Sequence, residues 1–170
     1  MGFTGQILVG RGEAFIEALR QFWDWDEEVS DDWQLRDDWR AVCVRTPAED
    51  GELTELADTA DAPLLACLVL ESDTADIEGI SSAGRWKAEF QREIAVERPD
   101  TARAAVVWAG EAGLIVDVSQ VEEVLSTPWK PLAEHGFFAL LAALGIADPE
   151  PPRSRPGPEH IAALEAGPIP

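Results

Sequence analysis

The chain has 170 residues, of which 46% are apolar, and it carries a net charge of −20. That length is typical of one domain, and the apolar content excludes a disordered chain. Thirty-three acids against thirteen bases repel phosphates, so direct binding to nucleic acid or to an anionic membrane is not expected. No apolar run approaches the roughly 18 residues of a membrane span, and residues 1–10 lack the charged start of a secretory signal.

The two cysteines, Cys43 and Cys67, lie inside apolar runs and are 24 positions apart. This spacing matches no zinc or redox motif. We therefore expect two buried thiols rather than a disulfide, which is typical of a reducing compartment, and a cytoplasmic protein.

Apolar patterning predicts strands at residues 6–9, 39–45, 64–70, 75–81 and 85–91. The run at 64–70 is continuously apolar and is expected to be the central strand. The last two strands are separated by Ser82, Ala83 and Gly84, which favours an antiparallel hairpin.

Helices are predicted where apolar residues recur three and four positions apart. The first begins at Glu13, and the second covers residues 52–60. The third runs from a cap at Asp100 to Ala109, the fourth from a cap at Ser119 to Leu125, and the fifth from Pro131 to Leu144. Gly145 then ends the last helix.

These elements predict an α+β fold, in which helices pack on a small, mainly antiparallel sheet and the C-terminal half is helical. We expect one acidic domain over residues 1–146 and a Pro-rich tail over 147–170. A short helix at 158–166 in that tail would carry Ile161 and Leu164 on one side.

The acidity is regional. Residues 24–78 hold eighteen acids and three arginines, a net charge of −15, which leaves −5 for the rest of the chain. Tryptophans alternate with acids in the first part of this segment, as expected of an interface for a basic partner. The candidate partner-binding residues are Asp24, Trp25, Asp26, Glu27, Glu28, Asp31, Asp32, Trp33, Asp37 and Asp38. The alternative interpretation is an acidic loop, with Trp23 and Trp39 in the core.

Chemical motifs are incomplete. The segment from Gly10 lacks the third glycine of a dinucleotide loop, and the segment from Asp24 lacks the glycine and the final glutamate of a calcium loop. His135, next to Glu134, is the only acid–base candidate, and the carboxylates of Asp73, Asp76 and Glu78 form a weak metal motif. We predict no catalytic residue, no metal site and no cofactor.

Some local stretches resemble a family of small uncharacterised actinobacterial proteins. They are MGFTG at 1–5, VGR at 9–11, LVLESD at 68–73, IEG at 77–79 and Trp86. The resemblance covers about the first 90 residues, and it implies no activity.

The leading functional hypothesis is an acidic protein-binding module. It would act as an immunity protein or inhibitor that covers the basic active-site surface of a toxin or nuclease, or would bind another basic protein such as a DNA-binding protein. The alternatives are a DNA mimic, an enzyme acting on a small polar substrate, and a scaffold or subunit of a complex.

Overall fold

The computed structural model of the protein describes residues 2–49, 51–94, 99–129 and 132–148. Its strands are β1 (Gly5–Arg11), β2 (Val29–Gln34), β3 (Trp39–Val44), β4 (Leu64–Leu70), β5 (Thr74–Ser81) and β6 (Gly84–Gln91). Its helices are α1 (Gly12–Phe22), α2 (Trp25–Glu28), α3 (Glu52–Ala60), α4 (Pro99–Glu111), α5 (Val118–Leu125) and α6 (Glu134–Ala143). The α+β class predicted from the sequence is confirmed.

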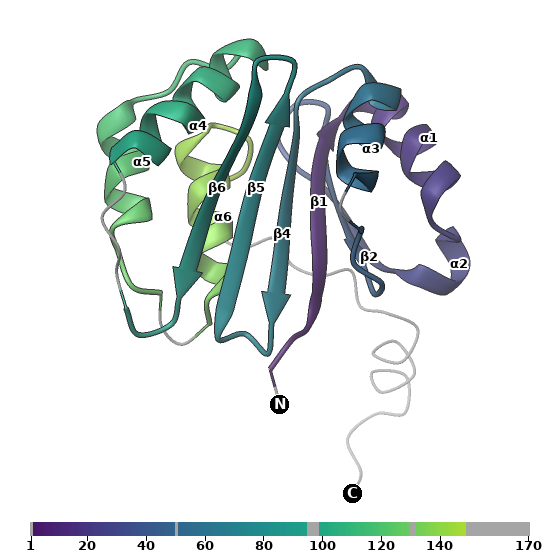
Figure 1. Cartoon of the computed structure of the whole chain (residues 1–170), viewed down its shortest axis with the longest axis horizontal. Helices are drawn as coiled ribbons and strands as arrows, with labels where there is room; N and C mark the ends of the chain where they lie inside the picture. Colours follow the sequence, from purple (N-terminus) through teal and green to yellow (C-terminus); the bar gives the residue numbers. More distant parts are fainter. Residues whose placement is uncertain (1, 50, 95–98, 130–131, 149–170) are drawn as a thin grey trace, which may run out of the picture.

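The strands form one antiparallel sheet in the order β2-β3-β1-β4-β5-β6, with helices on both faces (Figure 1). The apolar run at 64–70 is β4, which lies at the centre beside β1, as predicted. The predicted hairpin is also confirmed, since β5 and β6 pair in register from Thr74–Gln91 to Ser81–Gly84.

One face of the sheet packs against α4 and α6, and α5 packs on these two helices. The aromatic side chains at its centre are Trp39, Trp86 and Trp108, of which Trp39 and Trp108 are 1% exposed. Their rings lie 6.1 Å (Trp39 to Trp108) and 6.5 Å (Trp86 to Trp108) apart. Burial of rings of this size contributes strongly to the stability of a core.

The opposite face is covered over only part of its width. There, α1 and α3 pack on side chains of β1, β3 and β4, and the ring of Phe15 lies directly over Gly10. A Cβ atom at Gly10 would lie 2.3 Å from that ring, so this close contact between helix and strand requires glycine. The charged side chains of β5 and β6 on this face lie beyond the two helices, and no helix in the described ranges covers them.

Two predicted helix caps are wrong. The cap of α5 is Asp117, whose carboxylate accepts a hydrogen bond from the Ser119 amide at 2.9 Å, so Ser119 lies inside the helix. Asp100 lies inside the first turn of α4, after Pro99. The predicted stop is confirmed, because Gly145 follows α6 with a φ of +78°, a conformation that glycine adopts without strain.

The prediction of buried thiols is confirmed. Cys43 on β3 and Cys67 on β4 both pair with Ile7 of the intervening strand β1. Two strand spacings, about 9.5 Å, separate them, and this exceeds the Cα separation that a disulfide tolerates.

Within the ranges given above, none of the helices combines the length and the apolar character that crossing a membrane requires. The predicted short helix at 158–166 lies outside the described residues.

Candidate functional site

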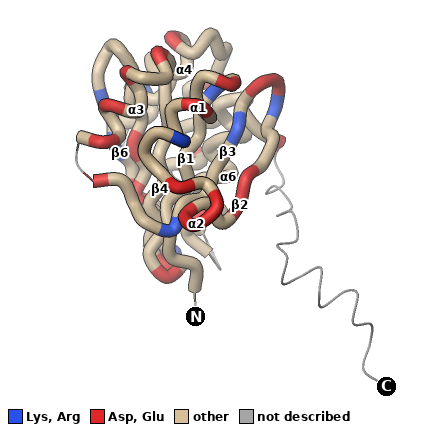
Figure 2. The backbone as a smooth tube through the Cα atoms, turned by 90° about the vertical axis from the view of Figure 1, so that its right-hand side faces the viewer, with Lys and Arg blue, Asp and Glu red and all other residues tan. Residues whose placement is uncertain are grey.

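Residues 24–38, which we call the acidic edge segment, form the free edge of the sheet rather than a loop. Asp24 begins the short helix α2, strand β2 follows, and a turn at Asp37 leads into β3. Acidic positions therefore run along the edge, from α2 through β2 to the β2–β3 turn (Figure 2). Sequence reasoning missed this strand because four of its six residues are polar and no apolar alternation marks it.

Three of the eight acids in this segment are held by neighbouring groups. Asp24 caps α2 by accepting hydrogen bonds from the Asp26 and Glu27 amides. The carboxylate of Asp32 accepts two hydrogen bonds from Nη2 of Arg40, at 2.6 and 2.8 Å. The third acid, Asp38, pairs with Arg11. These carboxylates have a structural role in the segment.

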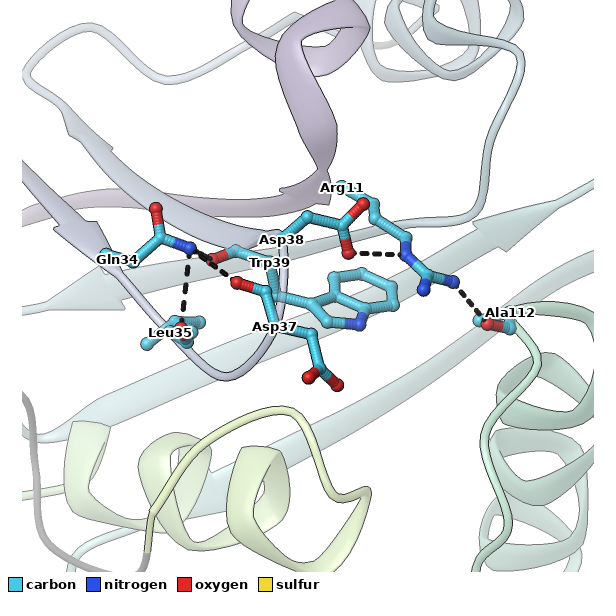
Figure 3. Close-up of polar contacts among 7 residues, drawn as sticks. All are labelled: Arg11, Gln34, Leu35, Asp37, Asp38, Trp39 and Ala112. Carbon is cyan, nitrogen blue, oxygen red and sulfur yellow. Dashed lines mark hydrogen bonds and ion pairs between the residues drawn. The ribbon is translucent and has the colours of Figure 1, made fainter.

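Arg11 joins three segments at the end of β1 (Figure 3). Its Nε donates to Asp38 at 2.7 Å, its Nη1 donates to the carbonyl of Ala112 at 3.1 Å, and its guanidinium lies 5.7 Å from the centre of the Trp39 ring. Nearby, Nε2 of Gln34 donates to backbone carbonyls of the same turn, including that of Asp37 at 2.9 Å. These contacts hold the turn against the end of α4, and an arginine near a helix C-terminus is favourable.

The other five acids have neither a hydrogen bond nor an ion pair through their carboxylates to any described residue. They are Asp26, Glu27, Glu28, Asp31 and Asp37. Three lie on α2, one on β2 and one in the turn, so unpaired negative charge is present at both ends of the edge strand. The described residues make no backbone pairing on the outer side of β2. As far as the described residues go, the backbone groups on this side are therefore left for an added strand.

Neither candidate tryptophan is a free anchor. Trp25 is half-buried with the guanidinium of Arg20 over its ring at 5.1 Å, and Trp33 packs edge-on against Phe138 of α6 with ring centres 6.5 Å apart. Trp33 lies on the side of β2 that faces α6, because it pairs with Ala41. Trp23 and Trp39 are core residues, as the alternative interpretation predicted.

Two acids on this edge have oppositely shifted pKa values. Partial burial raises the pKa of Asp31, whereas the hydrogen bond from Arg11 lowers the pKa of Asp38. The ionised form of Asp38 is thus favoured by folding, and its contribution to stability is lost as the pH falls through its lowered pKa. The neutral form of Asp31 is favoured by folding. Its contribution to stability is present below the pKa of Asp31 in the unfolded chain and is lost as the pH rises through the raised pKa of the folded protein.

We therefore expect Asp31→Asn to stabilise the protein at neutral pH and Asp38→Asn to destabilise it, each by less than about 1 kcal/mol because Asp38 is exposed and Asp31 is only partly buried. Both differences from the native chain should shrink in acid, as the native carboxyl groups become neutral. Urea denaturation of the three proteins from neutral to acidic pH measures this. Changes of the same sign in the free energy of unfolding of the two variants would contradict the opposite pKa shifts of Asp31 and Asp38.

The other chemically interesting residues do not form one site. Glu134 is buried and accepts a hydrogen bond from the hydroxyl of Ser72 at 2.8 Å, while His135 is half-buried. This contact, together with the bond from the Ala133 amide to the Ser72 carbonyl, ties the β4–β5 turn to the start of α6. Asp73 lies in that turn and pairs with Arg92, whereas Asp76 and Glu78 lie on β5. In the described part of the chain no three His, Cys, Asp or Glu side chains gather as metal ligands would.

Comparison of the chain with protein-family models, with curated proteins and with solved structures found no match.

Proposed function

We propose that this protein is an acidic binding module, an immunity protein or inhibitor that holds a basic protein against the β2 edge. The observation that carries the proposal is the unpaired carboxylates at both ends of an edge strand whose outer side no described residue covers. Acidic fields of this kind accelerate association with a basic partner, and an open strand edge accepts backbone hydrogen bonds from an extended segment. A toxin or nuclease with a basic active-site surface is the partner class that fits.

The paired acids and the unpaired acids have different roles in this proposal. Asp32 and Asp38 keep β2 and its turn in place through Arg40 and Arg11. The unpaired carboxylates keep their charge available to a partner, and neutralising them removes attraction without removing a described contact. Such charges mainly affect the association rate.

The experiment compares two variants of equal net charge. The edge variant carries Asp26→Asn, Glu27→Gln, Asp31→Asn and Asp37→Asn. The control variant carries Glu13→Gln, Glu17→Gln, Glu55→Gln and Asp58→Asn, all exposed positions on α1 and α3. Native protein on a support is used to isolate from a source-cell lysate the basic protein that it retains at low salt. Association of that purified partner is then measured with all three proteins.

We expect the edge variant to associate at least about tenfold more slowly and the control variant to remain within about twofold of the native protein. The native protein should also abolish the partner's own activity at a stoichiometric ratio. Equal slowing of both variants would mean that net charge alone attracts the partner, and the edge would not be the site. Displacement of the native protein by duplex DNA would instead favour the DNA-mimic alternative.

A further inference from the structure

The connection between α4 and α5 presents apolar side chains at the surface. Residues 114–118 read LIVDV, and in this run Ile115 is 101% exposed and Val118 is 37% exposed. Leu114 and Val116 are partly buried. We call these four apolar residues the apolar cap. A run of exposed apolar residues lowers solubility, and in natural proteins such a surface is normally covered by another segment or by a partner.

The fold holds the apolar cap in place but does not use the side chain of Ile115. Leu114 and Val116, on either side of it, pack against the core. The Leu114 amide donates to the carbonyl of Ala109 at 2.9 Å, which closes the end of α4, and Asp117 caps α5. The connection is therefore fixed at both ends. A surface that is already ordered costs little further entropy when another segment packs on it.

The described chain stops at the same end of the molecule. Asp148 pairs with the guanidinium of Arg36 in the β2–β3 turn, at 2.9 Å. Two positions further along this turn, Asp38 pairs with Arg11, which also donates to the carbonyl of Ala112 after α4 (Figure 3). These contacts connect Asp148 to the end of α4 through the turn. The Pro-rich tail therefore begins at the end of the sheet that carries the apolar cap.

The tail supplies an apolar segment of matching size. Residues 161–164 read IAAL, so the helix predicted at 158–166 carries Ile161 and Leu164 on one side. A helix of nine residues is marginal in water by itself and needs an apolar surface to pack on. The connecting residues 149–157 span about 28 Å when extended, which is sufficient for a surface at the same end of the molecule.

Charge also favours the apolar cap as the surface for the tail. The connecting residues contain Arg153 and Arg155. Exposed Glu111 and Asp117 border the cap, and neither forms an ion pair with a described residue. An arginine beside the C-terminus of α4 is also favoured by the helix dipole. The acidic edge segment would attract arginine too, but in its described residues no large apolar side chain is exposed to receive Ile161.

We propose that residues 158–166 form a helix that packs Ile161 and Leu164 on Ile115 and Val118 of the apolar cap in the same chain. The tether keeps this segment at a millimolar effective concentration, so a weak apolar contact is sufficient to hold it. The contact covers the exposed run of the α4–α5 connection and gives the short helix its missing partner. It is independent of the function proposed for the acidic edge segment.

The test is paramagnetic broadening of NMR signals in the isotope-labelled full-length chain. Cys43 and Cys67 are buried, and burial raises the pKa of both thiols, so a nitroxide attaches selectively to Ala166→Cys. This position lies on the side of the predicted helix opposite the apolar pair. We expect the amide signals of Ile115 and Val118 to lose most of their intensity relative to the reduced nitroxide. The signals of β2 should keep theirs.

Two substitutions remove one half of the contact each, and two matched substitutions leave it intact. Leu164→Ser and Ile115→Ser should each restore most of the lost intensity. Ala163→Ser lies on the opposite side of the predicted helix, and Ile94→Ser changes an isoleucine after β6 that is 59% exposed. Both should leave the broadening unchanged. Because the Ile115 side chain is fully exposed, Ile115→Ser should keep the native amide spectrum, which is recorded first.

Mixing isotope-labelled chains without nitroxide and nitroxide-labelled chains at natural isotope abundance separates the two sources of the tail. Broadening that arises only between chains would assign the apolar cap to the tail of a second copy and would overturn the proposal. Absence of broadening at the cap, broadening confined to β2, or equal recovery with Ile94→Ser would overturn it as well. No basic partner is present in this experiment, so its failure is distinguishable from failure of the proposed function, which the edge variant tests.

Discussion

Replacing Trp108 with alanine is expected to destabilise the protein by about 4–5 kcal/mol, the largest loss for a single side chain in this core. The indole is 1% exposed and lies between the rings of Trp39 and Trp86. Its Nε1 donates to the carbonyl of Ile80 at 3.0 Å, which joins α4 to β5. The substitution therefore leaves a large cavity and a buried carbonyl without its partner. Urea denaturation followed by far-UV circular dichroism measures the loss.

Two further variants make this result interpretable. Trp108→Phe keeps most of the ring but removes the donor, so we expect a smaller loss of about 1–3 kcal/mol. Val107→Ala changes the neighbouring residue of α4, which is 60% exposed, and should alter the free energy of unfolding by less than about 0.5 kcal/mol. A Trp108→Ala variant as stable as Val107→Ala would contradict the packing of α4 on the sheet.

The second large effect is expected for Gly79→Ala, at about 2–3 kcal/mol of destabilisation. Gly79 of β5 lies beneath the indole of Trp86, its partner on β6. A Cβ atom at Gly79 would stand 2.1 Å from Nε1 of that ring. The ring has no space to move away, because it is 7% exposed and packs against Trp108. Either the indole leaves its position in the core or the two strands separate.

Gly110→Ala is the matched control for this prediction. Gly110 lies in α4, and apart from its chain neighbours and the backbone of its own helix no atom lies within 4 Å of the site of its added Cβ, so the substitution should stabilise the protein by about 0.5–1 kcal/mol. The contact itself is tested by repeating Gly79→Ala in a Trp86→Leu background, where the clash is absent and the cost should be much smaller. Strictly additive effects of the two substitutions would show that the indole does not press on Gly79.

Most elements with an apolar period were predictable from the sequence. The stripe from Phe15 to Leu19 predicts α1, the continuous run at 64–70 predicts β4, and residues 52–60 match the bounds of α3. In each of them the buried face is encoded by neighbours within a few residues, because helices repeat every 3.6 residues and strands every two.

Strand β2 shows where this reasoning fails. Its six residues, VSDDWQ, carry little apolar signal, because an edge strand is half-exposed and its register shifts between Val29 and Asp31. Pairing with β3 makes it a strand, and that pairing turns Trp33 towards α6 and Asp32 towards Arg40. The concentration of acid was visible in the sequence, whereas the division into paired and unpaired acids was not.

The sequence by itself therefore determined the class of fold, the bounds of most helices and strands, the burial of Trp23 and Trp39, and the region of negative charge. Only the tertiary structure decided which distant groups meet. Arg11 pairs with Asp38, Ser72 donates a hydrogen bond to Glu134, and Asp76 stands opposite Glu89 in the sheet. The physical reason is the separation along the sequence of the residues that set each property. Periodic burial is encoded by adjacent residues, whereas these contacts depend on strand order and register, which the whole chain sets together.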